Sequence, residues 1–527
     1  METKQTKQTE KKKVDWLITL LPLGLIVVLC ILFFFKPEQS NQVLSQIRYV
    51  FGDTFGTYYL VIGLGVFLLS IYVATSKYGN IVLGAQTEKP KYSFFAWGSM
   101  MFTAGLAADI LFYSFSEWVM YATDPHIAEL GSIREWAGVF PIFHWSLIPW
   151  GFYLVLAVAF GFMLHVRNRE RQKYSEACRP ILGKHTDGML GRIIDLLAVF
   201  ALIAGTATTF SIATPLMASI INELFHIELS RTVVTIIIIL ITCVIYTYSL
   251  LHGFKGISFL AKACVYLFFG LLLFVLLFGG ETKFIIENGF ASLGKVVQNF
   301  FELSTFTDPE RTTSFPQNYT IYYWAYWMVW CVATPFFIGK ISKGRTVKNT
   351  VLGGYGWGLA GTFTSFIILG NYGLAQQMKH GLDVSGSIAA NGDYSAAIMK
   401  IFDTLPLSSI GLILLVITMI AFYSTTFDAL TMVISSYSYK KLKVDEEPDK
   451  KVRTFWAIMF ILFPIALIFS ENSMYSLQSV SIIAAFPIGI IVIMIVASFF
   501  KDAKKYLEEK EKPVICEEDK KETEANK

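Results

Sequence analysis

Long apolar runs recur along the whole chain, and they limit its fold more than any other feature. Of the 527 residues, 54% are hydrophobic and 16% are charged, with a mean hydropathy of +0.53. A helix of about 20 apolar residues crosses the roughly 30 Å hydrocarbon core of a bilayer. Windows of about 19 residues predict twelve such spans, near 15–35, 56–76, 94–121, 138–166, 193–222, 232–250, 256–280, 320–342, 350–375, 407–438, 453–471 and 474–500. We therefore expect an all-α integral membrane protein, with tilted or broken helices where a span exceeds the bilayer thickness.

Positive charges in the connecting segments predict the orientation. The N-terminal segment 1–14 is rich in lysine, and cations recur after the fourth predicted span, at 167–192, and after the eighth, at 340–348. Segments on the opposite side, such as TDPHIAELGSIRE and NELFHIELSR, contain few cations. The positive-inside rule thus predicts a multi-pass protein of the plasma membrane with both termini in the cytoplasm. A cleavable signal peptide is the alternative for the first run, but that run is too long and lacks a small-residue cleavage site.

Composition and motifs argue against several functional classes. The net charge of +4 is small for this length and no basic domain is visible, so no nucleic-acid partner is predicted. The six cysteines are scattered, which favours neither a disulfide framework nor a metal site. The sequence has no Gly-rich phosphate loop, HExxH motif or serine elbow, so we expect no enzyme and no cofactor, with Na⁺ as a candidate coupling ion only. A channel would need a short repeated filter motif, which the sequence lacks.

Two parts of the chain carry matching patterns that predict an internal repeat. Spans three to seven and eight to twelve each begin with a helix that contains a helix-weakening patch, TAGLAAD at 103–109 and VATPFF at 332–337. The third helix of each set carries hydroxyl groups, in GTATTFS at 205–211 and YSTTFDA at 423–429. Transporters often consist of two inverted copies that meet at a midplane site built from discontinuous helices. Chance is the alternative, because the shared Thr-Thr-Phe is short.

Aromatic residues cluster in two of the predicted spans. The segment IYYWAYWMVWCVATPFF spaces three tryptophans three residues apart, and FHWSLIPWGFY supplies a second group; the residues are Trp324, Trp327, Trp330, Trp145, Trp150 and Tyr153. A cation without N–H donors cannot be held by hydrogen bonds, so ring faces and carboxylates are the groups that bind it. Tryptophans in membrane proteins also form interfacial belts, which suits Trp324 better than the deeper Trp327 and Trp330. Two clusters on separate helices favour an aromatic cage.

The motif WAYWMVW followed by ISKGRTVKN, together with FHWSLIPWGFY, resembles the betaine/carnitine/choline transporter family over nearly the whole chain. The resemblance implies an ion-coupled symporter, driven by Na⁺ or H⁺, that moves choline, glycine betaine or carnitine by alternating access. A cation-independent exchanger of the carnitine/butyrobetaine type is the alternative. It also implies the five-plus-five inverted repeat of sodium-coupled amino-acid carriers, two extra N-terminal helices and a homotrimer.

The resulting segments are a cytoplasmic tail at 1–14, two extra spans at 15–93, a first repeat at 94–281, an extracytoplasmic connection at 282–319, a second repeat at 320–500 and a cytoplasmic tail at 501–527. In the family an aromatic box binds the trimethylammonium group. Carried over, the box consists of Trp145, Trp150, Tyr153 and Trp327, with Trp330 as a further contact. Tyr326 stands where many members have another tryptophan.

The third span departs from the glycine-rich GMGIG type of the family's betaine carriers. This chain has Gly105, Leu106, two alanines and then Asp109, which is similar to choline-type members. We expect Gly105, Leu106 and Asp109 to contact the substrate, because an ionisable group at membrane depth is a functional hypothesis by default. Asp109 would face a cationic substrate or take up a proton, and a helix cap is its alternative role. The following SEW lacks the proline usual after that glutamate, which resembles carnitine-type exchangers.

The resemblance also implies where a coupling ion would bind. The family's second sodium site maps onto the carbonyls of Thr103, Leu106 and Phe422 and the side chains of Thr425 and Thr426. Carnitine-type exchangers are similar in having a fixed cation near Lys262, which would take the place of sodium. The alternative is that Lys262 extends its ammonium group to the cytoplasmic interface.

Overall fold

The computed structural model describes residues 13–227, 229–444, 446–468 and 474–511. Within these ranges the chain is helical, and its strand-like pairings are two isolated β-bridges, Val14 with Tyr439 and Val82 with Thr346. The expectation of an all-α fold is confirmed. Most of the two predicted tails, at 1–12 and 512–527, lies outside the described residues, as does the end of the eleventh predicted span at 469–471.

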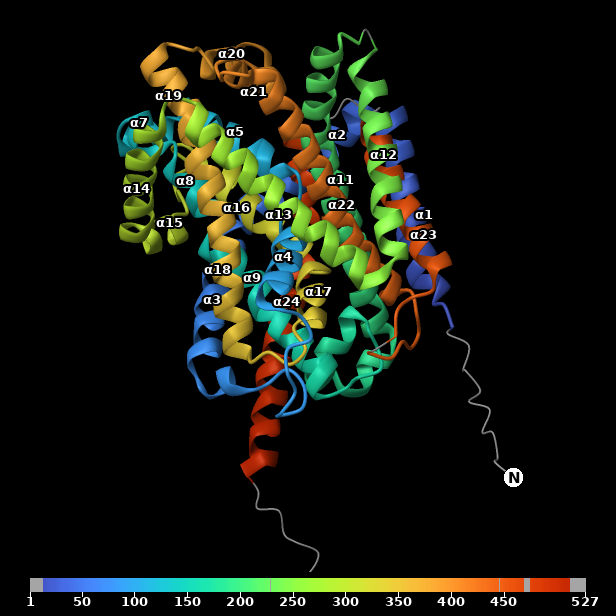
Figure 1. The fold of residues 1–527 in the computed structure, drawn as a ribbon. Helices are drawn as coiled ribbons and strands as arrows, with labels where there is room; N and C mark the ends of the chain where they lie inside the picture. The colour runs from blue at the N-terminus through green and yellow to red at the C-terminus, as the bar shows by residue number, and fades with distance from the viewer. Residues whose placement is uncertain (1–12, 228, 445, 469–473, 512–527) are drawn as a thin grey trace, which may run out of the picture.

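Helices occupy all twelve predicted spans (Figure 1). In chain order these are α1 (Trp16–Phe35), α3 (Gly56–Thr75), α4 (Phe94–Gly105) with α5 (Asp109–Ala122), α8 (Val139–His144) with α9 (Leu147–Gly161), α11 (Met189–Phe225), α12 (Arg231–Leu251), α13 (Gly253–Phe278), α16 (Ile321–Trp330) with α17 (Thr334–Ile341), α18 (Val347–Ser365) with α19 (Asn371–His380), α22 (Ser408–Tyr437), α23 (Lys450–Ile468) and α24 (Met474–Glu511). The remaining helices connect them: α2 (Pro37–Arg48), α6 (Pro125–Leu130), α7 (Ile133–Trp136), α10 (Arg179–Leu182), α14 (Thr282–Gln298), α15 (Phe300–Thr305), α20 (Ser385–Asn391) and α21 (Tyr394–Asp403).

The number of membrane-crossing helices agrees only in part with the predicted twelve. In the part of the chain that is described, eight helical segments are long and apolar enough to cross a membrane, or ten when each of two bent pairs counts as one span. Helices α1 and α23 are not among them, although the 20 residues of α1, WLITLLPLGLIVVLCILFFF, are predominantly apolar. The inverted repeat and the segment boundaries stay predictions.

Both helix-weakening patches lie at breaks, as the sequence predicts. Helix α4 ends at Gly105 and α5 begins at Asp109 with its axis bent by 58°, and the axis bends by 50° between α16 and α17. Pro335 lies in the first turn of α17, where a residue without an N–H group cannot continue the hydrogen bonding of the preceding helix. The two breaks expose backbone groups inside the protein, where they can meet a ligand.

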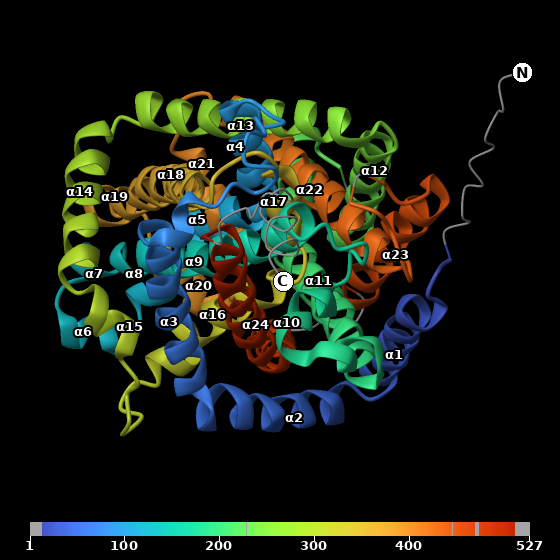
Figure 2. The same cartoon turned by 90° about the horizontal axis from the view of Figure 1, so that it is seen from below.

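The layers of the molecule follow the burial of its apolar side chains. Figure 2 shows α2, α13 and α14 along the outer edge and α9, α16 and α17 inside. Every residue of α9 from Ile148 to Gly161 is buried, whereas α13 leaves Phe259 and Leu277 exposed. A helix that is apolar all round belongs in a protein core, and one with exposed apolar residues at the periphery faces lipid.

Helices α9 and α17 approach so closely that one glycine has no room for a side chain. A Cβ atom on Gly339 would lie 2.7 Å from the carbonyl oxygen of Ala157 and 2.7 Å from the amide nitrogen of Gly161. Small residues at helix crossings allow such backbone contact in membrane proteins. Because α9 carries Trp150 and Tyr153, and α17 follows directly on the helix that carries Trp327, this contact positions the aromatic groups relative to one another.

We expect Gly339→Ala to destabilise the protein by about 1–3 kcal/mol, the usual cost of overpacking. The atoms that the new methyl group meets are backbone atoms, so relief requires a helix to move. Thermal unfolding in detergent, followed by tryptophan fluorescence, measures the effect. Gly356→Ala is the matched control, because no atom lies within 4 Å of its added Cβ and alanine favours a helix. Equal unfolding temperatures for the two variants would contradict the prediction.

Candidate functional site

Four aromatic rings from the α8–α9 segment and from α16 form one cluster. The ring of Trp327 lies 4.9 Å from that of Tyr153, 5.4 Å from that of Trp145 and 5.9 Å from that of Trp150, between centroids. All four side chains are buried, and Trp150 also meets Tyr153 at 5.9 Å. The structure therefore brings together the four residues predicted for the aromatic box.

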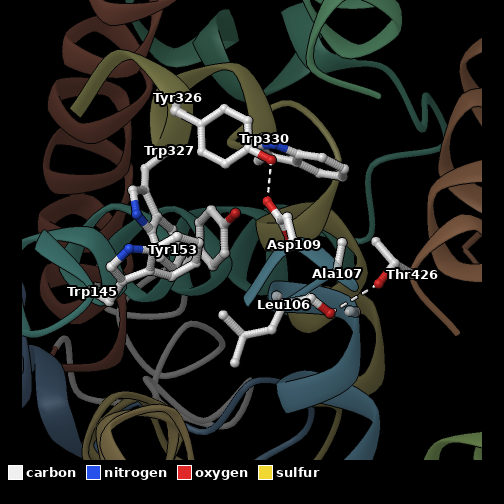
Figure 3. Close-up of a pocket in the computed structure, with 11 residues that line it drawn as sticks. Leu106, Ala107, Asp109, Trp145, Tyr153, Tyr326, Trp327, Trp330 and Thr426 are labelled. Atoms are coloured by element: carbon white, nitrogen blue, oxygen red, sulfur yellow. Dashed lines mark hydrogen bonds between the residues drawn. The ribbon is translucent and has the colours of Figure 1, made fainter. Parts of the chain in front are cut away.

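A narrow pocket lies between this cluster and the break that separates α4 from α5 (Figure 3). Its free space admits little more than one water molecule, so the surrounding groups must separate before a larger ligand enters. The predicted residues that line it are Gly105, Leu106, Asp109, Trp145, Tyr153, Trp327, Trp330 and Thr426. Trp150 is not among the lining residues and lies behind them. It packs against Gly105 so closely that a Cβ atom added to this glycine would lie 3.0 Å from Cη2 of the Trp150 ring.

A carboxylate faces this pocket beside the aromatic wall. Asp109 is the first residue of α5, is 2% exposed, and accepts a hydrogen bond from the Tyr326 hydroxyl. That hydroxyl also hydrogen-bonds the side chain of Thr209 on α11. Tyr326 thus ties α5, α11 and α16 together, a role that the sequence analysis missed. Two departures from the family pattern, at 109 and 326, are the only signal in the sequence that could have paired them.

A second carboxylate holds one of the box residues in place. Glu117 is fully buried and accepts hydrogen bonds from the indole nitrogen of Trp145 at 2.7 Å and from the Tyr121 hydroxyl at 2.6 Å. His144 Nδ1 lies 2.9 Å from the same hydroxyl, and its Nε2 lies 3.0 Å from the Thr320 hydroxyl. Sequence reasoning missed this network, because its members come from three separated segments. Its effect is to fix the orientation of the Trp145 ring.

Oxygen atoms gather on the other side of the break. The Thr426 hydroxyl lies 2.9 Å from the carbonyl oxygen of Thr103 and 3.0 Å from that of Leu106. These carbonyls are at the end of α4, where a helix leaves its last C=O groups without intrahelical partners. The Thr425 hydroxyl bonds carbonyls of its own helix, at 2.9 Å from that of Phe422. Carbonyl and hydroxyl oxygens are the donors that suit an alkali cation, so the residues present fit a sodium ion.

The structure does not bring Lys262 to this oxygen cluster. Lys262 lines a different pocket together with Lys91, Lys255 and Arg453, while its neighbour Ala261 is buried. This placement matches the alternative in which the lysine extends toward the interface.

The sequence model described as the betaine/carnitine/choline family transporter matches residues 17–508. The chain is 30% identical to the probable glycine betaine transporter of Desulfitobacterium hafniense, over 89% of this chain and 93% of that protein. It is 29% identical to the osmo-dependent choline transporter BetT2 of Acinetobacter baylyi, over 88% of this chain and 68% of that protein. It is 26% identical to a carnitine transporter of Acinetobacter baumannii, over 84% of this chain and 80% of that protein.

A solved structure of a Na⁺-coupled sialic acid symporter aligns with 85% of this chain and 86% of its own, at 15% identity and a TM-score of 0.47. This similarity is too low to carry an argument about fold or coupling. The match of the family model to residues 17–508 establishes the family, since it spans nearly the whole chain. The chain belongs to the betaine/carnitine/choline transporter family, whose members are multi-pass membrane transporters and not enzymes.

Proposed function

We propose that this protein is a secondary active transporter that carries choline across the plasma membrane by alternating access, coupled to Na⁺. The observation that carries the proposal is the Asp109 carboxylate, which faces the same pocket as the aromatic rings of Trp145, Tyr153 and Trp327. Figure 3 shows these rings on one side of the pocket and Asp109, Leu106 and Thr426 on the other. Rings and a carboxylate together bind a cation that has no N–H donors.

The same carboxylate favours choline over the zwitterions. Glycine betaine and carnitine carry a carboxylate of their own, which would meet Asp109 inside a buried pocket. Like charges in such a site repel, and an unanswered buried charge costs several kcal/mol. Choline brings only a positive charge, which the carboxylate attracts. Glycine betaine and carnitine are accordingly the weaker substrates in this proposal.

Leu106 supplies the link between the ion and the substrate. Its side chain lines the pocket, and its carbonyl oxygen lies 3.0 Å from the Thr426 hydroxyl. A sodium ion bound by the carbonyls of Thr103 and Leu106 and the hydroxyls of Thr425 and Thr426 would neutralise the oxygen dipoles there. The hydrogen bonds from Thr426 to the carbonyls of Thr103 and Leu106 hold the segment between α4 and α5 in place. The conformation of that segment sets the position of Asp109 relative to the rings. Ion binding and substrate binding would therefore favour the same conformation.

Both termini are cytoplasmic in this proposal, and the protein forms a homotrimer like the family it resembles. Contacts among the basic segments support the shared side of the termini. Arg167 pairs with Asp502 of α24 at 2.9 Å, and Lys173 pairs with Asp15 at 2.6 Å. The basic loop after α9 therefore lies beside both described ends of the chain, as the positive-inside rule requires of cytoplasmic segments.

Uptake into vesicles that contain the reconstituted protein tests the proposal. Radiolabelled choline, glycine betaine and carnitine are compared while sodium and proton gradients are imposed separately. We expect saturable choline uptake that an inward sodium gradient drives, with counterflow. Uptake that never saturates would indicate a channel, and faster uptake of a zwitterion or a response to the proton gradient alone would contradict the assigned substrate or ion.

We expect Trp327→Leu to weaken choline binding by roughly 2- to 30-fold, because a ring face contributes about 0.5–2 kcal/mol of cation–π attraction. Intrinsic fluorescence or radioligand titration of the purified protein measures the affinity. Trp324→Leu is the matched control, since Trp324 lies one turn earlier on α16 and packs against Phe143 and Gly63 outside the pocket. Unchanged affinity in Trp327→Leu, or an equal loss of affinity in the control, would contradict the proposal that the aromatic rings bind the substrate.

A further inference from the structure

A second pocket lies where α12 ends and α13 and α23 begin, and it is strongly basic. The charged residues that line it are Lys91, Lys255, Lys262, Lys450, Arg453 and Glu447. Glu447 pairs with Arg453 at 3.2 Å and is the one carboxylate among these six lining residues, against five cationic side chains. Such an excess of positive charge in a concave site attracts an anion.

Three of these lysines have no partner in the part of the chain that the structure describes. Among the described residues, Lys255, Lys262 and Lys450 make no hydrogen bond or ion pair. Lys91 places its ammonium group 5.7 Å from the ring of Phe254, which also lines the pocket. The amino groups are therefore available to a ligand.

The floor of the pocket contains a buried guanidinium with a donor to spare. Arg453 is 5% exposed and donates from Nη1 to the Leu250 carbonyl oxygen at 2.8 Å, at the end of α12. Its Nε atom is buried and has no hydrogen-bond partner in the described part of the chain. A buried N–H group without a partner costs free energy, and the planar fork of a guanidinium matches the oxygens of a phosphate group.

The start of α13 adds further donors to the same pocket. Gly253, Phe254 and Lys255 line it, and the side chain of the N-cap residue His252 makes no capping hydrogen bond. Gly253 has a φ of +64°, which lets the chain turn tightly out of α12. The first N–H groups of a helix bind anions, phosphate groups in particular.

The pocket opens onto a surface that faces lipid. Phe259 of α13 lines the pocket and is 77% exposed. Tyr248 of α12 and Tyr266 of α13 are 68% and 67% exposed. Figure 2 shows α13 along the outer edge of the molecule. Exposed aromatic side chains beside a basic pocket suit a ligand that joins an anionic head to apolar chains. A soluble anion would make no use of them.

We infer that this pocket binds the head group of an anionic phospholipid of the cytoplasmic leaflet. Lys340 from the predicted cytoplasmic segment 340–348 places its ammonium group 5.8 Å from the ring of Phe254, so the pocket lies on the side of the basic loops. Basic pockets between membrane helices on that side hold lipid head groups. The choice of leaflet rests on the proposed orientation, whereas lipid binding is independent of the transported substrate.

Native mass spectrometry of the full-length protein in detergent, titrated with dioleoylphosphatidylglycerol or dioleoylphosphatidylcholine, tests the inference. We expect selective binding of phosphatidylglycerol, weakened roughly 10- to 30-fold in Lys255→Gln/Lys262→Gln, since each lysine near an anionic head group contributes about 1 kcal/mol. Lys504→Gln/Lys505→Gln is the control, which removes two exposed lysines of α24 outside the pocket. Its affinity should equal that of the parent.

Inorganic phosphate separates a lipid from a soluble anion, and we expect it not to displace the lipid at equal concentration. Displacement at equal concentration, equal binding of the two lipids, or parent-like affinity in Lys255→Gln/Lys262→Gln would each overturn the inference. Thermal unfolding in lipid-free detergent shows whether the variants fold like the parent, and Lys262→Gln alone replaces the double variant if they do not.

Discussion

Asp109→Asn is expected to weaken choline binding by at least about 30-fold. Removing one member of a buried charge pair costs about 2–5 kcal/mol, which corresponds to that factor or more. Asparagine has the shape of aspartate, and its side-chain oxygen can still accept the hydrogen bond from Tyr326. The substitution therefore removes the charge and keeps the geometry. Titration of the purified protein with choline in sodium buffer measures the change.

Glycine betaine provides the sharper comparison in the same variant. Its carboxylate no longer meets a negative charge at position 109, so its affinity should rise or stay the same while that of choline falls. Tyr326→Phe is the matched control, because it removes the hydroxyl group and leaves the carboxylate in place, and its effect on choline should be smaller. If Asp109→Asn leaves choline, betaine and carnitine binding intact, Asp109 serves only to begin α5.

The double variant Thr425→Ala/Thr426→Ala is expected to abolish the stimulation of choline binding by sodium. The two hydroxyls are the side-chain donors of the proposed ion site, and backbone carbonyls alone leave an alkali cation incompletely coordinated. Of the single variants, Thr426→Ala should carry most of the loss, because Thr426 contacts the carbonyls of Thr103 and Leu106 while Thr425 bonds within its own helix. Choline titrations with sodium and with an inert cation measure the response.

Lys262→Ala is the control for the ion site. Its side chain lies in the basic pocket beside Lys255 and Arg453, so the variant should keep the full sodium response. A parent protein that binds choline equally well with and without sodium, together with a loss of binding in Lys262→Ala, would reverse the assignment and support a fixed cation in place of the ion.

The sequence predicts the helices and their breaks well, because both depend on local properties. Apolar length decides where a helix can cross a membrane, and the patches at 103–109 and 332–337 contain the glycine and proline that weaken a helix. The aromatic box residues also come together as expected, since two groups on separate spans need only those spans to be neighbours. Trp150 shows the limit of this reasoning, because spacing does not reveal which ring lines the pocket and which lies behind it.

Pairings between distant segments could not be predicted in this way. The hydrogen bonds from Tyr326 to Asp109 and from Trp145 to Glu117 join different helices, and no local pattern encodes them. Lys262 illustrates a second limit. A helix turns by about 100° per residue, so neighbouring side chains point to different sides of α13: Ala261 is buried, whereas Lys262 lines the basic pocket.

The break between α4 and α5 brings two helix ends of opposite polarity close together, at Gly105 and Asp109, with three residues between them. Aligned peptide dipoles give a helix about half a negative elementary charge at its C-terminal end and half a positive one at its N-terminal end. The oxygen cluster near Thr426 lies at the negative end of α4, where a cation gains from the field. The positive end of α5 is where the carboxylate of a zwitterion would gain most, and in this chain Asp109 already occupies it. The protein's own side chain thus provides the negative charge that a zwitterionic substrate would otherwise bring.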